Sequence, residues 1–261
     1  MGVLNVTPDS FSDGGRFLDA QAAVAHGLEM ADEGADILDV GGESTRPGAD
    51  PVAPPEQIRR VVPAIEGLAA RGLDAQISID TTRLAVAEAA VAAGATYVND
   101  VSAFRADPDL AGLVAERGLD CCLTHMRGDP RTMQAEAVYD DVVSDVKAFL
   151  EERLAAAVAA GVAEERIMLD PGIGFAKTLE HNLELLRRLD ELVALGRPVV
   201  IGTSRKSFLG RITGREADDR LAGTIATNVL ALERGASVFR VHDVAPVADA
   251  LAVAAATVRG R

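Results

Sequence analysis

The chain contains no tryptophan, and only 3% of its 261 residues are aromatic. It has only two cysteines, Cys121 and Cys122, which are neighbours on an apolar run of strand length. Adjacent residues of a strand point to opposite faces. We therefore predict two buried thiols that form neither a disulfide nor a metal site.

Long hydrophobic runs are also missing. No apolar stretch approaches the ~20 residues that cross a bilayer, and the N-terminus lacks the basic and then apolar order of a signal peptide. The sequence therefore predicts a cytoplasmic protein without a membrane partner. Positive charge is scarce, because 26 Lys and Arg stand against 40 Asp and Glu, a net charge of −14. This repulsive overall field argues against nucleic acid as a partner.

Short apolar runs recur along the chain, and each is followed by a polar or glycine-rich loop and an Ala- and Leu-rich stretch. The runs are too short for helices and rich in Val and Ile, which predicts buried parallel strands. The eight runs are 3–4, 37–40, 77–79, 97–98, 121–123, 167–169, 199–201 and 238–241. Six helical stretches are predicted to end at a glycine able to adopt the left-handed conformation: Gly34, Gly94, Gly118, Gly161, Gly196 and Gly235.

Eight strand-helix units describe an α/β fold, a single (β/α)₈ TIM barrel. The length suits one domain spanning residues 1–261. Active sites of this fold lie at the C-terminal ends of the strands. The polar loops after the predicted strands are therefore the place to look for function.

Cations cluster in the loops after predicted strands 7 and 8, which read Ser204-Arg205-Lys206-Ser207 and Arg240-Val241-His242-Asp243. Barrels that bind phosphorylated ligands commonly hold the phosphate beside these two loops. Cations near a helix N-terminus are unfavourable with its dipole and need another reason to be there. The alternative is a solvated helix start at Arg205 and Lys206, with Arg240 paired to Asp243 or another carboxylate.

Acceptors end three other strands: Asp80 after strand 3, Asn99 after strand 4 and Asp170 after strand 6. Carboxylates and amides together match a planar heterocycle with several N–H donors and a carbonyl, such as a pterin or guanine ring. The alternative is that each caps the following helix. Asp170 is the least cap-like, because residues 171–174 read Pro-Gly-Ile-Gly and delay the next helix.

Further motifs stand at the strand ends. Two long glycine-rich loops, 5–15 and 39–48, follow the first two strands, and later ends carry Ser78-Ile79-Asp80-Thr81, Val98-Asn99-Asp100, His125-Met126-Arg127-Gly128, Leu169-Asp170-Pro171-Gly172 and Gly174-Phe175. With the two cationic loops, these motifs make the chain closely resemble the dihydropteroate synthases, the folate-pathway enzymes of bacteria, over essentially its whole length. Relatives often have Gly-Lys where Ala176-Lys177 stands, a mild change that we do not expect to matter.

The resemblance implies condensation of 6-hydroxymethyl-7,8-dihydropterin diphosphate with 4-aminobenzoate, giving 7,8-dihydropteroate and pyrophosphate. It implies a dissociative path, in which the electron-rich ring stabilises a cation at the exocyclic methylene and no protein nucleophile is needed. Mg²⁺ is the implied cofactor, held partly by the hard oxygen of Asn5. The resemblance alone implies a homodimer and a target of the sulfonamide class of drugs.

The resemblance also assigns roles residue by residue. The pterin ring is expected to contact Asp80, Asn99, Asp170 and Lys206. Pyrophosphate is expected to contact Asn5, Thr45, Arg240 and His242. Aminobenzoate is expected beside Thr45, Pro47, Phe175, Lys206 and Ser207. The residues expected to act in the reaction itself are Asp80, Asp170, Lys206, Arg240 and His242.

Two rival functions stay open at the level of sequence. A pterin-binding methyltransferase barrel would share the Asp and Asn ring but need neither the Ser204-Arg205-Lys206 motif nor the pyrophosphate cations. A noncatalytic pterin-binding paralogue would show eroded loops at 9–15 or 43–48, and neither loop is eroded. Among the histidines, His26 and His181 look like ordinary helix residues, and His125 has an uncertain reach into the pocket.

Overall fold

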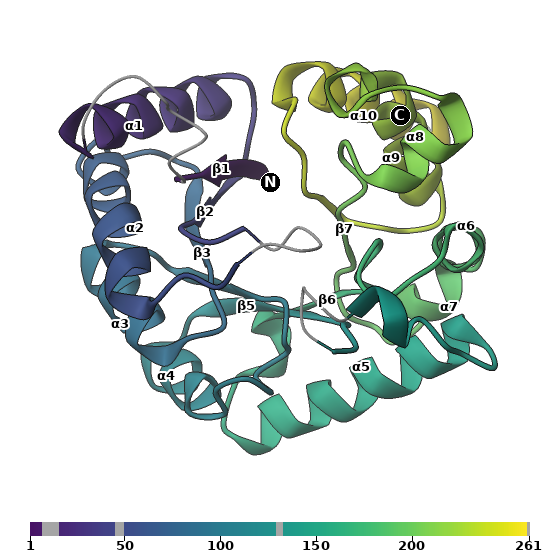
Figure 1. Ribbon diagram of the computed structural model, residues 1–261, viewed down its shortest axis with the longest axis horizontal. Helices are drawn as coiled ribbons and strands as arrows, with labels where there is room; N and C mark the ends of the chain where they lie inside the picture. The colour runs from purple at the N-terminus through teal and green to yellow at the C-terminus, as the bar shows by residue number, and fades with distance from the viewer. Residues whose placement is uncertain (7–15, 45–49, 129–132, 260–261) are drawn as a thin grey trace.

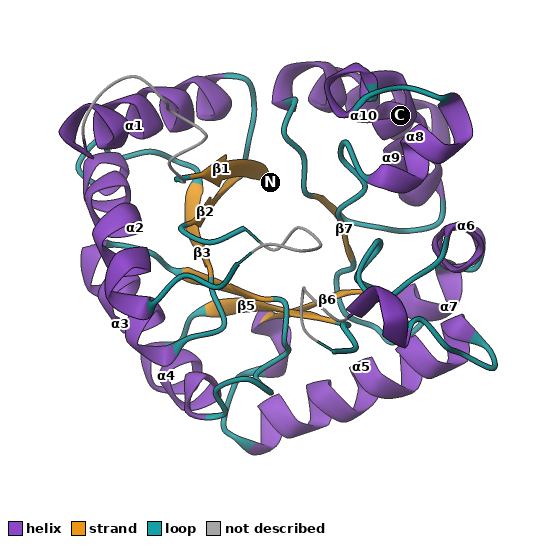
Figure 2. Ribbon diagram, in the orientation of Figure 1, coloured by secondary structure: helices purple, strands orange, loops and turns teal. Residues whose placement is uncertain are grey.

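The computed structural model describes residues 1–6, 16–44, 50–128 and 133–259. Eight strands are found within these residues. The strands lie at the centre and the helices surround them (Figures 1 and 2). The strands coincide with the predicted apolar runs and are β1 (Gly2–Asn5), β2 (Ile37–Gly41), β3 (Gln76–Asp80), β4 (Tyr97–Asp100), β5 (Asp120–Thr124), β6 (Ile167–Asp170), β7 (Val200–Ile201) and β8 (Val238–Phe239).

All described strand pairs are parallel. The strands β1 to β6 form one sheet in sequence order, and β7 pairs with β8. Isolated parallel bridges connect the two sheets, Leu169 with Val199 on one side and Gly2 with Val241 on the other. At the second junction the Val3 amide donates to the Val241 carbonyl at 2.9 Å. The strand order therefore returns to its start, which fits the predicted (β/α)₈ barrel.

Helices connect successive strands on the outside of the ring. Two short helices, α7 and α8, are additions to the basic alternation. The helices are α1 (Arg16–Asp32), α2 (Pro54–Ala69), α3 (Leu84–Ala93), α4 (Asp109–Arg117), α5 (Val142–Ala159), α6 (Leu179–Arg187), α7 (Asp190–Val193), α8 (Ser207–Thr213), α9 (Leu221–Glu233) and α10 (Val244–Arg259), with 3₁₀ turns at Met133–Glu136, Glu164–Arg166 and Ala217–Asp219.

The predicted helix-ending glycines have the backbone conformation that their position requires. All six have positive φ, between 59° and 120°. Gly118 is the clearest case, because it closes α4 in the left-handed region at φ 59° and ψ 41°. A side chain at such a residue would be strained, so these helix-to-strand turns depend on glycine.

The strand side chains alternate between the outer core and the inside of the ring. Cys121 packs in the large core beneath the helices, whereas Cys122 packs inside with Tyr97 and Val200. Both thiols are buried and free, as predicted. The Tyr97 hydroxyl on β4 reaches the Met168 sulfur on β6 at 3.3 Å, across the interior. The lower interior is therefore an apolar plug rather than a channel.

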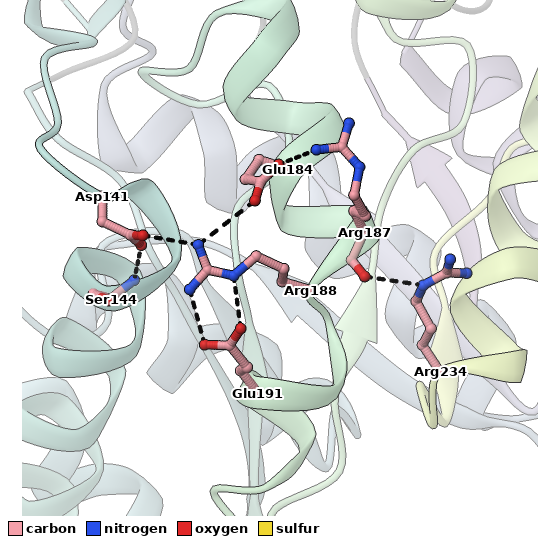
Figure 3. Close-up of polar contacts among 7 residues, drawn as sticks. All are labelled: Asp141, Ser144, Glu184, Arg187, Arg188, Glu191 and Arg234. Carbon is pink, nitrogen blue, oxygen red and sulfur yellow. Dashed lines mark hydrogen bonds and ion pairs between the residues drawn. The ribbon is translucent and has the colours of Figure 1, made fainter.

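Ion pairs tie three outer helices together, as Figure 3 shows. Arg188, just after α6, donates to Asp141 at 2.8 Å and to both oxygens of Glu191 at 2.6 and 3.0 Å. Asp141 is also the N-cap of α5, because it accepts from the Ser144 amide at 2.8 Å. The network thus fixes the relative positions of α5, α6 and α7. No helix in the described part of the chain is long and apolar enough to cross a membrane.

Candidate functional site

The inward face of the strands changes from apolar to polar toward their C-terminal ends. The lower part of this face carries apolar residues at positions 37, 97, 168 and 238. Two positions further along the chain, on the same face, the residues are polar or charged, at positions 39, 99, 170 and 240. The period of two along a strand therefore places a polar layer directly above the apolar plug. This layer contains Asp39, Asp80, Asn99, Asp170 and Arg240.

Arg240 lies between two carboxylates. Its Nε donates to Oδ2 of Asp39 at 2.6 Å, and its Nη2 donates to Oδ2 of Asp80 at 2.8 Å. The prediction that a carboxylate other than Asp243 could pair with Arg240 is confirmed. Arg240 remains accessible from the mouth although it is paired with these carboxylates, because 23% of its side-chain surface is exposed. A cation therefore reaches the mouth from β8, as expected for a phosphate site.

The pKa of the Asp80 carboxyl is raised to about 7. Burial is the main cause, and the negative charge of Asp39 adds to it, whereas Arg240 acts in the opposite direction. Arg240 therefore favours the ionised form of Asp80, and a ligand that donates hydrogen bonds to the carboxylate would favour it further. Perturbed carboxyl groups of this kind are common at functional sites.

Asp39 was not among the residues predicted for the site. It lies in the middle of β2, is fully buried, and accepts hydrogen bonds from Ser78 at 2.6 Å and from the Asn99 amide nitrogen at 2.9 Å, besides Arg240. The signal that points to it in the sequence is a charged residue inside an otherwise apolar strand. Such a residue must find partners, because an unpaired buried charge is very costly.

The opposite side of the mouth is built by the loop between β6 and α6. Asp170 ends β6, and its Oδ1 accepts from the Gly172 amide at 2.6 Å. Burial raises the pKa of this carboxyl, while Lys206 and the Gly172 amide oppose the rise. The Asp170 side chain therefore accepts a hydrogen bond within its own loop. It does not cap α6, whose N-cap is Thr178.

Lys206 reaches the same loop from the end of β7. Its Nζ donates to the Ile173 carbonyl and lies 4.8 Å from the centre of the Phe175 ring. Burial lowers the pKa of Lys206 to about 8, and the charge of Asp170 partly compensates. A Cβ added at Gly202 would lie 3.7 Å from Nζ of Lys206 and 3.9 Å from Cβ of Arg240. Lys206 and Arg240 therefore lie on either side of Gly202 at the mouth.

The predicted cation cluster is only partly formed. Lys206 and Arg240 share the mouth, but Arg205 turns to Asp243, with 3.0 Å between Nε and Oδ2. Arg205 therefore follows the alternative interpretation, an ion-paired residue at a helix start. His242 is held by Ser204, whose hydroxyl lies 3.0 Å from its Nδ1.

Asn5 stands beside Asp80 across Gly41. A Cβ added at Gly41 would lie 3.7 Å from Oδ1 of Asn5 and 3.9 Å from Oδ2 of Asp80. Oxygens of Asn5 and Asp80 therefore both lie close to Gly41. No group of three or more His, Cys, Asp and Glu side chains in the described ranges is arranged to hold a metal. Hard oxygens in small number fit an ion such as Mg²⁺ that keeps waters and phosphate oxygens.

The remaining predicted residues are placed as follows. Phe175 is partly exposed beside Lys206, and Ser207 is exposed at the first position of α8. Thr45 and Pro47 lie outside the described residues, as do residues 9–15 of the first loop. Of the residues expected beside aminobenzoate, the structure therefore describes Phe175, Lys206 and Ser207.

His125 does not line the mouth but lies behind the β6 loop, almost fully buried, against Lys177. The edge of its ring meets the Phe149 ring at 4.8 Å between centres. His26 pairs with Glu29 at the surface, and His181 forms a capping box with Thr178, so both are ordinary helix residues as predicted.

A hollow of about 450 Å³ lies away from the mouth beside α5 and α6, lined by residues that include Tyr139, Asp141, Glu184 and Arg188. Its charged side chains pair with one another in the network of Figure 3. We therefore place the functional site at the mouth of the barrel, where carboxylates and cations converge from different strands.

Comparisons with known proteins find relatives over nearly the whole chain. The family of pterin binding enzymes matches residues 1–242. The dihydropteroate synthase of Mycobacterium leprae (strain TN) is 51% identical over 267 residues, covering 98% of this chain and 92% of that protein.

Solved structures agree as well. The Xanthomonas albilineans dihydropteroate synthase with 4-aminobenzoic acid has a TM-score of 0.92 and 50% identity, and the complex of that enzyme with 7,8-dihydropteroate has a TM-score of 0.89 and 47% identity. Both matches cover 98% of this chain and 92% of the other.

Proposed function

This chain belongs to the family of pterin binding enzymes, and we propose that within it the chain catalyses the dihydropteroate synthase reaction. It joins 6-hydroxymethyl-7,8-dihydropterin diphosphate to 4-aminobenzoate and releases pyrophosphate, as an alkyl-transferring enzyme of folate synthesis. The observation that carries this function is the polar layer at the mouth. Acceptors on β3, β4 and β6 face two cations from the ends of β7 and β8.

The acceptors hold the pterin ring in this proposal. Asp170 accepts the ring amino and N3 protons, and Lys206 donates toward the ring carbonyl and N5. Asp80 and Asn99 bind from the opposite side of the mouth. This assignment is supported by the burial of Asp80, Asn99 and Asp170, because hydrogen bonds made in a buried site discriminate strongly against ligands that lack the matching groups.

The diphosphate contacts Arg240 and His242, together with Thr45. Mg²⁺ fits beside Asn5, where it would neutralise charge on the departing diphosphate. Arg240 stabilises the negative charge that develops on the leaving oxygen, and its exposed edge is available for this from β8. The Ser204 hydroxyl lies 3.0 Å from Nδ1 of His242, and this contact helps to orient the imidazole.

Aminobenzoate binds against Phe175, between Lys206 and Ser207, with Thr45 and Pro47 completing the site. The Phe175 ring is a flat apolar surface for the benzene ring, and Lys206 offers a cation at its edge. Lys206 thus stands between the pterin and the aminobenzoate. This position explains why one residue can belong to both substrate sites.

The bond from the methylene carbon to the diphosphate oxygen breaks first, and its electron pair leaves with pyrophosphate. The ring stabilises the resulting cation, and the aminobenzoate nitrogen then forms the new C–N bond and loses one proton to solvent. No protein nucleophile is needed on this path, and in this proposal the Ser204 hydroxyl, 3.0 Å from Nδ1 of His242, orients the imidazole rather than attacks. The chain's contribution is therefore orientation and charge stabilisation.

The decisive experiment measures pyrophosphate release with both substrates and with each omitted in turn. Rapid release that requires both substrates supports the proposed function. Absence of release with the pterin diphosphate, aminobenzoate and Mg²⁺ all present would contradict it.

The proposal extends to assembly and location. Two helices that pack together, α9 and α10, expose Leu230, Val253 and Val258, with 47%, 69% and 53% of their surfaces accessible. Apolar exposure on adjacent helices supports a homodimer formed through this face. Light scattering on the purified chain tests it, and a monomer at all concentrations would contradict it. The two free buried thiols support a location in the reducing cytoplasm.

A further inference from the structure

We infer that Asp39 is a positioning residue for the proposed reaction, and that it acts through Asn99 and Arg240. The inference rests on the proposed function, because it assigns to Asp39 the orientation of two residues proposed to contact the pterin diphosphate. Asp39 itself is fully buried and cannot reach a ligand at the mouth.

Three donors from three different strands converge on the Asp39 carboxylate. Ser78 on β3 donates at 2.6 Å, Asn99 on β4 at 2.9 Å and Arg240 after β8 at 2.6 Å. Asp39 stands on β2 and its neighbour in the sheet is Ser78. A buried carboxylate is stable only when its oxygens are satisfied in this way. The arrangement therefore connects four strands through one side chain.

The carboxylate determines which end of the Asn99 amide faces it. An ionised carboxylate only accepts hydrogen bonds, so the amide nitrogen of Asn99 must point to Asp39. The amide oxygen is then directed elsewhere, and the hydrogen-bond polarity that Asn99 offers to a ring is set. An uncharged amide at position 39 could donate to Asn99 and reverse this orientation.

The same carboxylate holds the guanidinium of Arg240. Asp39 binds Nε, close to the stem of the side chain, whereas Asp80 binds the terminal Nη2. Asp80 stands at the mouth and is proposed to accept from the pterin, so its contact with Arg240 can be exchanged for a ligand. The buried contact to Asp39 remains, and it keeps Arg240 aimed at the leaving group.

The inference is tested with Asp39→Asn, Asn99→Ala and the double variant in the pyrophosphate-release assay. Asp39→Asn is expected to raise the KM for the pterin diphosphate and to lower kcat, each by on the order of 10-fold. The KM for aminobenzoate should change less than about 2-fold, since neither partner of Asp39 is proposed to contact it.

The double variant distinguishes a positioning role from a merely structural one, because only a positioning role predicts that the effects of the two substitutions are not additive. If Asp39 acts through Asn99, removing Asn99 should cost far less in the Asp39→Asn background than in the wild type. Asp100→Asn is the matched control, because Asp100 is equally buried and its carboxylate accepts from the Ser102 and Phe104 amides rather than from Asn99 or Arg240. That control should lower thermal stability without the selective effect on the pterin diphosphate.

A measurement on the wild type covers the case in which Asp39→Asn does not fold. The Nε–H signal of Arg240 in nitrogen-15 NMR should remain protected from exchange when pyrophosphate and Mg²⁺ are added. Loss of that protection, wild-type kinetics for Asp39→Asn, or strictly additive effects would each overturn the inference. Failure of the wild type to release pyrophosphate would instead refute the proposed function, and the NMR result would still report on Asp39.

Discussion

The side-chain nitrogen of Lys177 lies 2.9 Å from Nδ1 of His125, in a buried pair behind the loop that carries Asp170 and Phe175. Lys177 also donates to the Phe175 carbonyl at 3.0 Å. Burial lowers the pKa of both side chains, that of His125 to about 2, and the charge of Lys177 further lowers the pKa of His125. The pair therefore supports the loop with a neutral imidazole as the acceptor.

This pair predicts a component of the pH dependence of stability. The pKa of His125 is about 2 in the folded chain and about 6.5 when unfolded, so between these values only the unfolded state binds this proton. His125 therefore contributes its full share to the free energy of unfolding above pH 6.5. This contribution decreases as the pH falls below 6.5, by up to about 1.4 kcal/mol per pH unit.

The variant His125→Asn keeps an acceptor for Lys177 but removes the titration. Urea unfolding of wild type and variant between pH 5 and pH 8 isolates the effect, because carboxylates contribute to both proteins. The wild type should lose stability more steeply below pH 6.5. Parallel curves for the two proteins would show that His125 titrates normally in the fold.

Asp170→Asn should abolish synthesis while leaving the fold intact. An amide cannot accept both pterin protons and places a donor against a donor, a mismatch that costs several kcal/mol, about the effect of an unsatisfied buried polar pair. Turnover and circular dichroism check this. Asp243→Asn is the control, because Asp243 pairs with Arg205 away from the mouth. A folded Asp170→Asn enzyme with more than a tenth of wild-type turnover would disprove the role of Asp170.

Arg240→Lys should slow the chemical step even at saturating aminobenzoate. The lysine keeps the charge but cannot bridge Asp39 and Asp80 while facing the leaving group. Loss of such stabilisation lowers a rate by on the order of 10²-fold. Single-turnover kinetics measure it.

The contrasting variant, Ser207→Ala, should mainly raise the KM for aminobenzoate, and Lys206→Ala should affect both parameters. The dissociative path also predicts slow pyrophosphate release without aminobenzoate, with water as the trap. Isotope effects at the methylene that show bond breaking strictly dependent on the amine would exclude this path without excluding the synthase activity.

Ala176→Gly should stabilise the chain. Ala176 has φ 50°, a left-handed conformation that glycine adopts without strain, so the expectation that alanine here is a neutral change does not take this backbone into account. The gain should be about 0.5–1 kcal/mol after the entropy that glycine adds to the unfolded state.

Thermal unfolding tests this prediction, and Ala90→Gly in the buried face of α3 is the control with the opposite sign. An unchanged or lower melting temperature for Ala176→Gly would contradict the prediction that the positive φ of Ala176 lowers stability.

Much of this architecture follows from local pattern. The alternation of strand and helix predicted the barrel, and the glycines at helix ends were placed correctly because their requirement for positive φ is local. Asp80, Asn99 and Asp170 were found because the C-terminal ends of parallel strands meet at one edge. These features depend on a few consecutive residues, so the sequence determines them by itself.

The choice of partners was decided by the tertiary structure alone. Arg240 pairs with Asp39, 201 positions away, while the nearby Asp243 is taken by Arg205. Lys177 likewise meets His125 from a different strand end. Neither choice is visible in the sequence, because a buried charge pairs with whichever carboxylate the closed ring brings within hydrogen-bond distance, and that distance is set by packing across the barrel.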